Sequence, residues 1–375
     1  MNSVIQEIEK IRNGKPFQMI DSFYNRYSVV CRESDGSRTA YCFSVPIKND
    51  KTSSIVDMHF SHNKKESVFI GSEAVVVVSD QAQLINPYGQ CEVVFPGRAS
   101  KRTNGTICFK DATVRTEIRP TLNGLFVVMN CETNVQPKLL LRLNRSFKTT
   151  RVNDRYFSVM REKFVPFVTV SCVGQFNSSG EVIAPCKIQN EQIGETEYLL
   201  TVLQEGKNKS RIAVEINMQE TKLFQDTTVE SLNPKRNNAF GSIAFLGKSI
   251  QFGEQWLYSR LESTNIHQIQ NKTVLKAILH IPQLGYYKKP LTVRRIVKRF
   301  CSFGSNWGNK IAILDPVTQS TISHGYHHLD LTEILGNLRN RSENYVIQAP
   351  SANCPVIVST GDSFYAPQIL EVRFK

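Results

Sequence analysis

The stretch LKAILHI at residues 275–281 decides the fold, together with the closing run APQILEVRF at 366–374. Both are short, apolar-rich runs typical of β-strands, bounded by turn residues. Working outward from them, the whole region from Glu220 to Lys375 has the strand and turn pattern of one complete β-sandwich domain.

Six motifs follow one another along this region: LFQDTTVESLNP at 223–234, NNAFG at 237–241, LKAILHI at 275–281, SNWGN at 305–309, HLDLT at 328–332 and APQILEVRF at 366–374. In their order and spacing they resemble a known family, the DNRLRE-type domain, a jelly-roll β-sandwich counted among the carbohydrate-binding modules. The signature that names the family is absent. The resemblance implies a C-terminal jelly roll over residues 220–375 and a role in carbohydrate binding, and fold alone does not fix function.

Residues 1–16 predict a short helix, because four apolar side chains fall on one helical face: Val4, Ile5, Ile8 and Ile11. Ser3 with Gln6 has the form of a capping box, and Gly14 and Pro16 supply the end. The helix either docks on a sheet or serves as an oligomerisation helix, and two turns are too short to hold a coiled coil alone.

Residues 17–219 contain many short β-runs separated by turn chemistry, such as Ser34-Asp35-Gly36-Ser37 and Asn123-Gly124. This pattern indicates a β-sandwich region, either one large sandwich or two small ones. We therefore expect an all-β, multi-domain chain with divisions at 1–16, 17–219 and 220–375.

The chain carries 46 Lys and Arg against 33 Asp and Glu, which gives a net charge of +13. The densest cationic cluster is a short segment containing Lys288, Lys289, Arg294, Arg295, Lys298 and Arg299. No helix-turn-helix, zinc-finger or RNP-like motif accompanies it, so the charge favours an acidic polysaccharide or acidic protein partner over nucleic acid. Its structural alternative is a charged edge strand that blocks sheet-to-sheet aggregation.

The nine cysteines include no Cys-x-x-Cys motif, since the closest two, Cys31 and Cys42, are eleven positions apart. Most lie inside apolar runs, where cysteine behaves as a small buried hydrophobe. The first fifteen residues contain no signal-peptide pattern, and no apolar run is long enough to span a membrane. We expect cytoplasmic synthesis with reduced thiols, compatible with later release or assembly into an extracellular particle.

His324, His327, His328 and Asp330 suggest a metal cluster at first sight. Successive residues of a strand face opposite sides, so His328 is expected on one face with Tyr326, and His327 on the core face. Asp330 is better explained as a helix N-cap. We expect no metal and no cofactor, and no catalysis, because no recognised catalytic motif is present.

The candidate ligand-binding residues lie in the C-terminal domain. They are the aromatic and basic side chains Tyr286, Tyr287, Lys288, Lys289, Arg294, Arg295, Trp256 and Tyr258. Aromatic faces stack on sugar rings, and cations attract acidic groups. Trp307 and Trp256 have a structural alternative, which is to fill the end of a sandwich core.

The sequence thus predicts a non-catalytic β-sandwich module that binds polysaccharide, preferably acidic, through its C-terminal domain. The alternative is a structural subunit of a bacterial or phage-derived fibre, tail or particle, assembled as a homo-oligomer by contacts between sandwiches.

Overall fold

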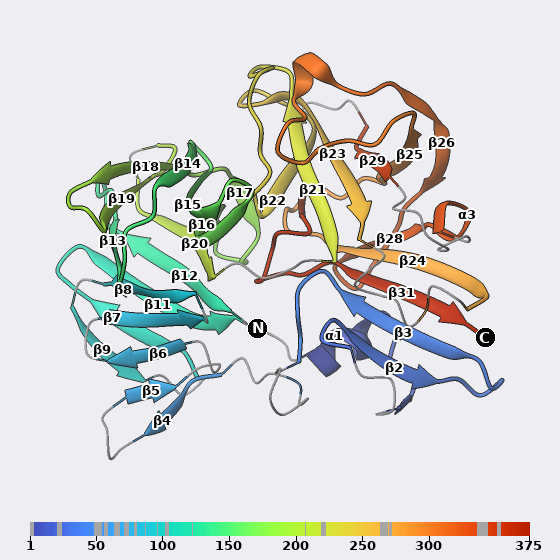
Figure 1. Ribbon diagram of the computed structural model, residues 1–375, viewed down its shortest axis with the longest axis horizontal. Coiled ribbons are helices and arrows are strands. Elements are labelled where there is room, and N and C mark those ends of the chain that lie inside the picture. Colours follow the sequence, from blue (N-terminus) through green and yellow to red (C-terminus); the bar gives the residue numbers. More distant parts are fainter. Residues whose placement is uncertain are drawn as a thin grey trace. The chain divides into compact units, whose positions relative to one another are not determined.

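Figure 1 shows the computed structural model of the protein. The structure describes residues 4–20, 25–48, 55, 59–63, 68–70, 75–78, 81–86, 88–95, 97–101, 105–121, 123–206, 208–218, 223–262, 269, 272–335, 344–350 and 354–375. Ser3, the expected helix cap, lies outside these residues.

The chain forms two compact units. One contains residues 1–55 and 221–375, and the other contains residues 56–220. We call the first the jelly-roll unit and the second the inserted unit. Each is built from two antiparallel sheets, which confirms the predicted all-β, β-sandwich fold class.

The jelly-roll unit contains the helix α1 (Val4–Ile11), the 3₁₀ turn η2 (Trp307–Asn309) and the short helix α3 (Thr332–Leu335). Its strands are β1 (Gln18–Met19), β2 (Ser28–Arg32), β3 (Arg38–Phe43), β21 (Phe224–Glu230), β22 (Ile243–Ser249), β23 (Gly253–Leu261), β24 (Val274–Pro282), β25 (Thr292–Ile296), β26 (Ile313–Gln319), β27 (Thr321–Ser323), β28 (Tyr326–Asp330), β29 (Asn344–Gln348), β30 (Val356–Ser359) and β31 (Ile369–Phe374).

Eight of these strands have jelly-roll connectivity. In chain order they are β3, β23, β24, β25, β26, β28, β29 and β31. One sheet holds the first, eighth, third and sixth as β3-β31-β24-β28, and the other holds the second, seventh, fourth and fifth as β23-β29-β25-β26. The chain therefore crosses repeatedly between two sheets, as the double Greek key of a jelly roll requires. The expected jelly roll is confirmed.

Its core lies between the two sheets. Cys42, Leu279 and Leu370 from the β3 sheet and Leu257 and Ile347 from the β23 sheet belong to one buried cluster. On β31, Leu370, Val372 and Phe374 are buried in this core while Glu371 and Arg373 between them are partly exposed. This is the alternation that a strand with one buried face produces.

The predicted domain boundaries need a correction. Residues 17–55 were expected in the first β-sandwich region, but β1, β2 and β3 belong to the jelly-roll unit, where β3 pairs with β31 over all six of its residues. Without β3 the edge of β31 would leave its backbone groups unpaired. The first strand of the jelly roll thus comes from residues 38–43, and residues 56–220 are inserted between it and the rest.

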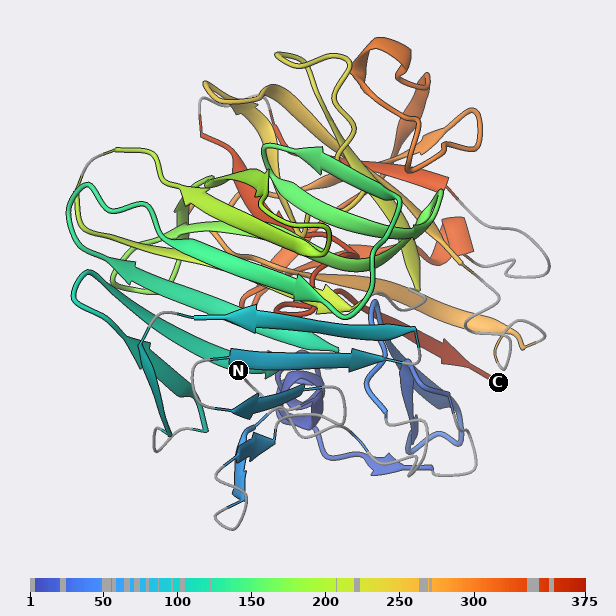
Figure 2. The ribbon, with the colours of Figure 1, turned by 60° about the vertical axis from the view of Figure 1, so that its left-hand side comes forward.

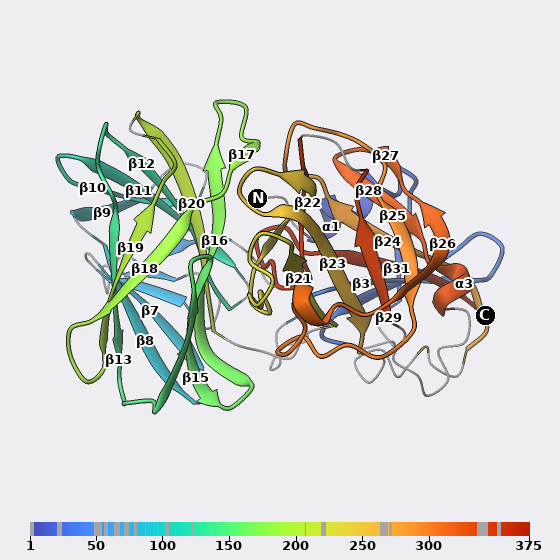
Figure 3. The same ribbon diagram turned by 90° about the horizontal axis from the view of Figure 1, so that it is seen from above.

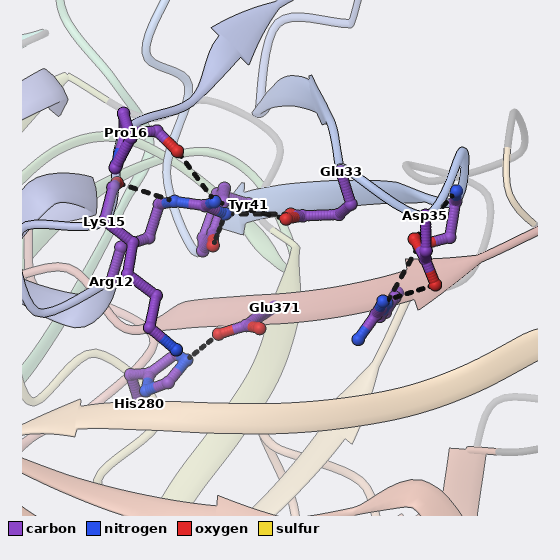
Figure 4. A network of polar contacts seen from close by, with 10 residues as sticks. Arg12, Lys15, Pro16, Glu33, Asp35, Tyr41, His280 and Glu371 are labelled. Atoms are coloured by element: carbon purple, nitrogen blue, oxygen red, sulfur yellow. Dashed lines mark hydrogen bonds and ion pairs between the residues drawn. The ribbon is translucent and has the colours of Figure 1, made fainter.

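The N-terminal helix docks on the outer face of the β3 sheet, with Val4 and Ile8 buried. Just past its end, Arg12 Nη1 donates to Glu33 Oε1 at 2.8 Å and to the Tyr41 hydroxyl at 2.9 Å (Figure 4). Gly14 has a φ of 71°, and its amide donates to the Glu9 carbonyl at 3.0 Å, which closes the helix as expected. The docking alternative is therefore confirmed.

The inserted unit is one large sandwich rather than two small ones. Its strands are β4 (Ser61–Asn63), β5 (Val68–Ile70), β6 (Val75–Val78), β7 (Gln81–Asn86), β8 (Gly89–Val94), β9 (Arg98–Lys101), β10 (Ile107–Lys110), β11 (Val114–Thr121), β12 (Gly124–Cys131), β13 (Lys138–Leu143), β14 (Thr149–Asn153), β15 (Tyr156–Glu162), β16 (Val165–Phe176), β17 (Val182–Ala184), β18 (Lys187–Gln192), β19 (Glu197–Leu203) and β20 (Ser210–Met218).

Its two sheets share a single buried core. Leu84 and Leu141 from the eight-stranded sheet pack in the same cluster as Val127, Val170 and Val214 from the nine-stranded sheet. The long strands of this unit run antiparallel beside one another (Figure 2, teal to green), and β16, β20 and β12 are neighbours in the nine-stranded sheet (Figure 3). One continuous core explains why the sequence contains no linker inside this region.

Candidate functional site

The predicted ligand-binding loop lies between β24 and β25. Tyr286 is 57% exposed, and its hydroxyl is 3.4 Å from Cys354 Sγ. Tyr287 packs partly against the jelly-roll core, with Lys289 Nζ 5.9 Å from its ring centroid. Lys288 and Lys289 are exposed. These four residues are adjacent in the fold as well as in the sequence.

Arg294 and Arg295 do not extend this loop into one basic surface. They are successive residues of β25 and so face opposite sides of the sheet. Arg294 Nη1 donates to the Leu314 carbonyl at 3.4 Å, and Arg295 Nη2 forms an ion pair with Glu333 Oε1 at 3.1 Å. Strand β25 also pairs with β26 on one side and β29 on the other, so the alternative of a protective edge strand is wrong.

Trp256 and Tyr258 are not available as a binding surface. Tyr258 is fully buried, and only 9% of Trp256 is exposed. Both lie in a cluster on the outer side of β23 with Ile296 and Phe300, covered by the segment that carries Trp307. Lys310 Nζ caps this cluster, 4.9 Å from the Trp256 ring centroid and 4.1 Å from that of Trp307. Filling a core is therefore the role of Trp256.

The histidines follow the predicted strand alternation. His327 is buried, with Nδ1 3.1 Å from Ser320 Oγ, while Tyr326 and His328 lie on the outer face. Asp330 Oδ1 accepts from the Thr332 amide at 2.9 Å at the start of α3, as expected of a cap. Within the described residues, no three His, Cys, Asp or Glu side chains are grouped so that they could hold a metal ion.

An open hollow of about 480 Å³ lies in the inserted unit. It lies at the ends of five neighbouring strands of the nine-stranded sheet, in the order β16-β20-β12-β11-β10. It is lined by the β10–β11 turn and the ends of the other strands, namely residues 110–115, 130–132, 176–178 and 209–211.

One row of side chains crosses this hollow. Phe176 lies opposite Arg211, Arg211 opposite Asn130, Asn130 opposite Arg115, and Arg115 opposite Lys110. Residues directly opposite one another in antiparallel strands project on the same face. The row therefore presents an aromatic ring, an amide and three cations on one face. At the usual spacing of neighbouring strands it spans about 19 Å.

Two of the three cations in this row lack a carboxylate partner. Arg115 lies 3.6 Å from Glu117 Oε1 and also contacts Cys108 Sγ. By contrast, in the part of the chain that the structure describes, neither Lys110 nor Arg211 forms an ion pair or side-chain hydrogen bond. An arginine offers five donors in a planar fork suited to carboxylate or sulfate oxygens.

Other lining groups add neutral hydrogen-bonding capacity. Ser210 Oγ is buried without a hydrogen-bond partner among the described residues, and a buried polar atom left unpaired is costly. Asn177 Nδ2 donates to Glu181 Oε2 at 2.9 Å, which fixes its position at the rim. Lys209 is paired with Glu132 at 2.6 Å on the exposed side. The hollow can thus offer positive charge, hydrogen bonds and one aromatic ring face to an acidic ligand.

Sequence reasoning missed this site. Its residues come from four separate segments. Each cation alone is typical of the solvent-exposed end of a strand. The signal would have been the pairing of β11, β12, β16 and β20, which brings Arg115, Asn130, Phe176 and Arg211 side by side.

No protein-family model matches the chain, and no curated protein matches it. Among solved structures, a heparinase III with methylated lysines matches 66% of this chain and 41% of its own length, at 9% identity and a TM-score of 0.20. The chain thus spans less than half of that structure, and a TM-score this low carries no argument. Among the described helices, none is long and apolar enough to cross a membrane.

Proposed function

We propose that the protein binds an acidic polysaccharide through the hollow at the end of the nine-stranded sheet. The observation that carries this proposal is the row Phe176–Arg211–Asn130–Arg115–Lys110. A ring face, an amide and two cations without partners suit a chain of sugars that bears carboxylate or sulfate groups. Hydrogen bonds between a guanidinium and such anions are strong when partly shielded from water.

Two further features support an acidic polymer as the ligand. The net charge of +13 attracts polyanions at long range. The row from Phe176 to Lys110 is long enough for several sugar units. A small anion would contact only one of its cations, so the length of the row favours a polymer. The resemblance of residues 220–375 to carbohydrate-binding modules is a separate prediction that agrees with this function but concerns the other unit.

Calorimetric titration of the full-length protein tests the proposal. The ligands are polygalacturonate, chondroitin sulfate and neutral dextran, with duplex DNA as a polyanion that lacks the sugar pattern. We expect binding to one of the acidic polysaccharides, weakening as salt rises, and none to dextran. Equal affinity for DNA would replace the proposal with general polyanion attraction.

Two charge-matched double variants locate the site. Lys110→Ala with Arg211→Ala should reduce affinity at least tenfold, since both free cations are lost. Lys288→Ala with Lys289→Ala removes the same charge from the exposed loop of the other unit and should leave affinity nearly unchanged. The reverse result would place binding on the loop that the sequence first suggested.

A further inference from the structure

Four polar residues on the outer face of the β3 sheet form a continuous hydrogen-bonded chain. Ser323 Oγ lies 2.7 Å from His328 Nε2, and His328 Nδ1 lies 2.6 Å from His280 Nδ1. His280 Nε2 in turn lies 3.0 Å from Glu371 Oε2 (Figure 4 shows this last contact). The chain crosses four neighbouring strands, because Ser323 on β27 is beside β28, His280 on β24 is opposite His328 on β28, and β31 lies on the other side of β24.

The direction of these hydrogen bonds follows from the chemistry of the groups. A carboxylate only accepts, so His280 donates from Nε2 to Glu371 and, as a neutral ring, accepts at Nδ1. His328 must then donate from Nδ1, which leaves a lone pair on its Nε2. The Ser323 hydroxyl donates to that lone pair. One neutral tautomer of each ring therefore satisfies these three contacts, and His328 Nε2 also lies 3.3 Å from the Ser323 carbonyl oxygen, farther than from the hydroxyl.

This direction is the one that activates a serine. A nucleophile needs a base within hydrogen-bonding reach and a third group that orients the base. Ser323 is the nucleophile position, His328 the base, and His280 with Glu371 the orienting pair. The buried His280, 2% exposed, fixes the half-buried His328, whereas Ser323 is exposed.

The serine also stands at an open position. It ends β27, and a two-residue turn of His324 and Gly325 leads into β28, with φ values of 49° and 82°. A side-chain carbon built on Gly325 would meet no atom within 4 Å, so a ligand can approach the turn. His324 Nδ1 is 3.3 Å from Ser323 Oγ and can donate to its free lone pair.

We propose that Ser323 is the nucleophile of a second, acyl-transfer site that hydrolyses carboxylic esters, with His328 as general base. Ser323 Oγ bonds to the carbonyl carbon of the ester while its proton passes to His328 Nε2. The bond from carbon to the leaving alcohol breaks as His328 returns the proton to the alcohol oxygen. Water, deprotonated by the same nitrogen, then releases the acid and restores the serine hydroxyl.

The surroundings keep the base neutral. Burial and the neighbouring His280 lower the pKa of His328, so Nε2 stays unprotonated at neutral pH. The other titratable groups that face it are Glu371, His324 and Tyr326, whose hydroxyl donates to Glu7 Oε2 of α1. Reactivity should therefore fall in acid as His328 takes a proton. This activity departs from the absence of catalysis expected from sequence, since its residues form no sequence motif, and it does not depend on the polysaccharide site.

A fluorophosphonate probe with peptide mass spectrometry tests the nucleophile in the full-length protein. We expect phosphonylation of Ser323, together with hydrolysis of p-nitrophenyl acetate. Ser323→Ala should abolish both, and His328→Gln should slow both on the order of a hundredfold. Thr321→Ala, on the same short strand and opposite His328, should change neither.

The orienting role of Glu371 needs a separate readout. Glu371→Gln should change the pH at which the rate falls in acid, because loss of the carboxylate charge weakens the polarisation of the His280 and His328 rings. A purely structural role would lower the rate without moving that limb. Lack of Ser323 labelling in folded protein, or labelling that is unaffected by His328→Gln, would overturn the proposal. Circular dichroism of each variant verifies folding.

Discussion

Tyr41 on β3 lies opposite Glu371 on β31 in antiparallel register. The pair joins the beginning of the chain to its end within one sheet. Arg12 reaches the Tyr41 hydroxyl from the N-terminal segment, and His280 contacts Glu371 from β24. The jelly roll is therefore closed by contacts between segments that are more than three hundred positions apart.

A chain that begins near residue 220 should accordingly fail to fold by itself. It lacks β3 and α1, so one edge of β31 and the outer face that α1 covers would be exposed to water. We expect aggregation, or a broad, non-cooperative urea transition by far-ultraviolet circular dichroism. A chain in which residues 56–220 are replaced by a short flexible linker keeps β3 and should unfold cooperatively. A sharp transition in the shorter chain would show that β3 is dispensable.

The fold class could be predicted from the sequence because the alternation of buried and exposed residues in a strand is a local pattern. The alternation of Leu370, Glu371, Val372 and Arg373 can be seen in any stretch of the chain, and so can the Asp35-Gly36 turn. The pairing of residues 38–43 with 369–374 has no local signal, which is why the domain boundary was misplaced. The prediction of the ligand-binding residues from the sequence was wrong for the same reason. Arg294 and Arg295 are neighbours in sequence but face opposite sides, while Arg115 and Arg211 are distant in sequence but share a face.

The cysteines should divide into a buried and a reactive group. Seven of the nine are buried, whereas Cys301 is exposed and Cys354 is half-buried. Burial raises the pKa of the Cys42 thiol to about 12 and that of Cys31 to about 11, so little thiolate forms near neutral pH. Ellman's reagent at pH 8 should label two thiols rapidly in native protein and all nine in guanidinium. Rapid native labelling of Cys301→Ser with Cys354→Ser would contradict the observed burial.

Tryptophan fluorescence should report on the jelly-roll unit alone. The chain has two tryptophans, Trp256 and Trp307, and both lie in the cluster beside β23, with ring centroids 4.7 Å apart. In urea, fluorescence should follow the unfolding of this unit, and circular dichroism should follow both units. Trp256→Ala should destabilise the fluorescence transition by about 3–5 kcal/mol, the usual cost of emptying a buried aromatic site.

The control for that substitution is Trp307→Ala. Because Trp307 is only partly buried, its removal should cost distinctly less. Neither change should shift the unfolding of the inserted unit, whose core contains no tryptophan. Equal costs for the two variants would mean that Trp256 is not the anchor of this cluster.

The stability of the jelly-roll unit should fall between pH 6.5 and 4 because of His327. Burial lowers the pKa of this histidine to about 4, so the folded ring stays neutral while the unfolded ring, with a pKa near 6.5, binds a proton. The unfolded state then binds more protons, and stability decreases as the pH falls through that window. The expected loss from this histidine is about 1.6 kcal/mol between pH 6.5 and 5, measured by urea unfolding with tryptophan fluorescence. His327→Gln removes the titrating ring, can still hydrogen-bond to Ser320, and should lose correspondingly less over the same interval. Since other groups, His328 among them, titrate in both proteins, the difference between the two slopes isolates His327, and identical slopes would contradict its buried, neutral state.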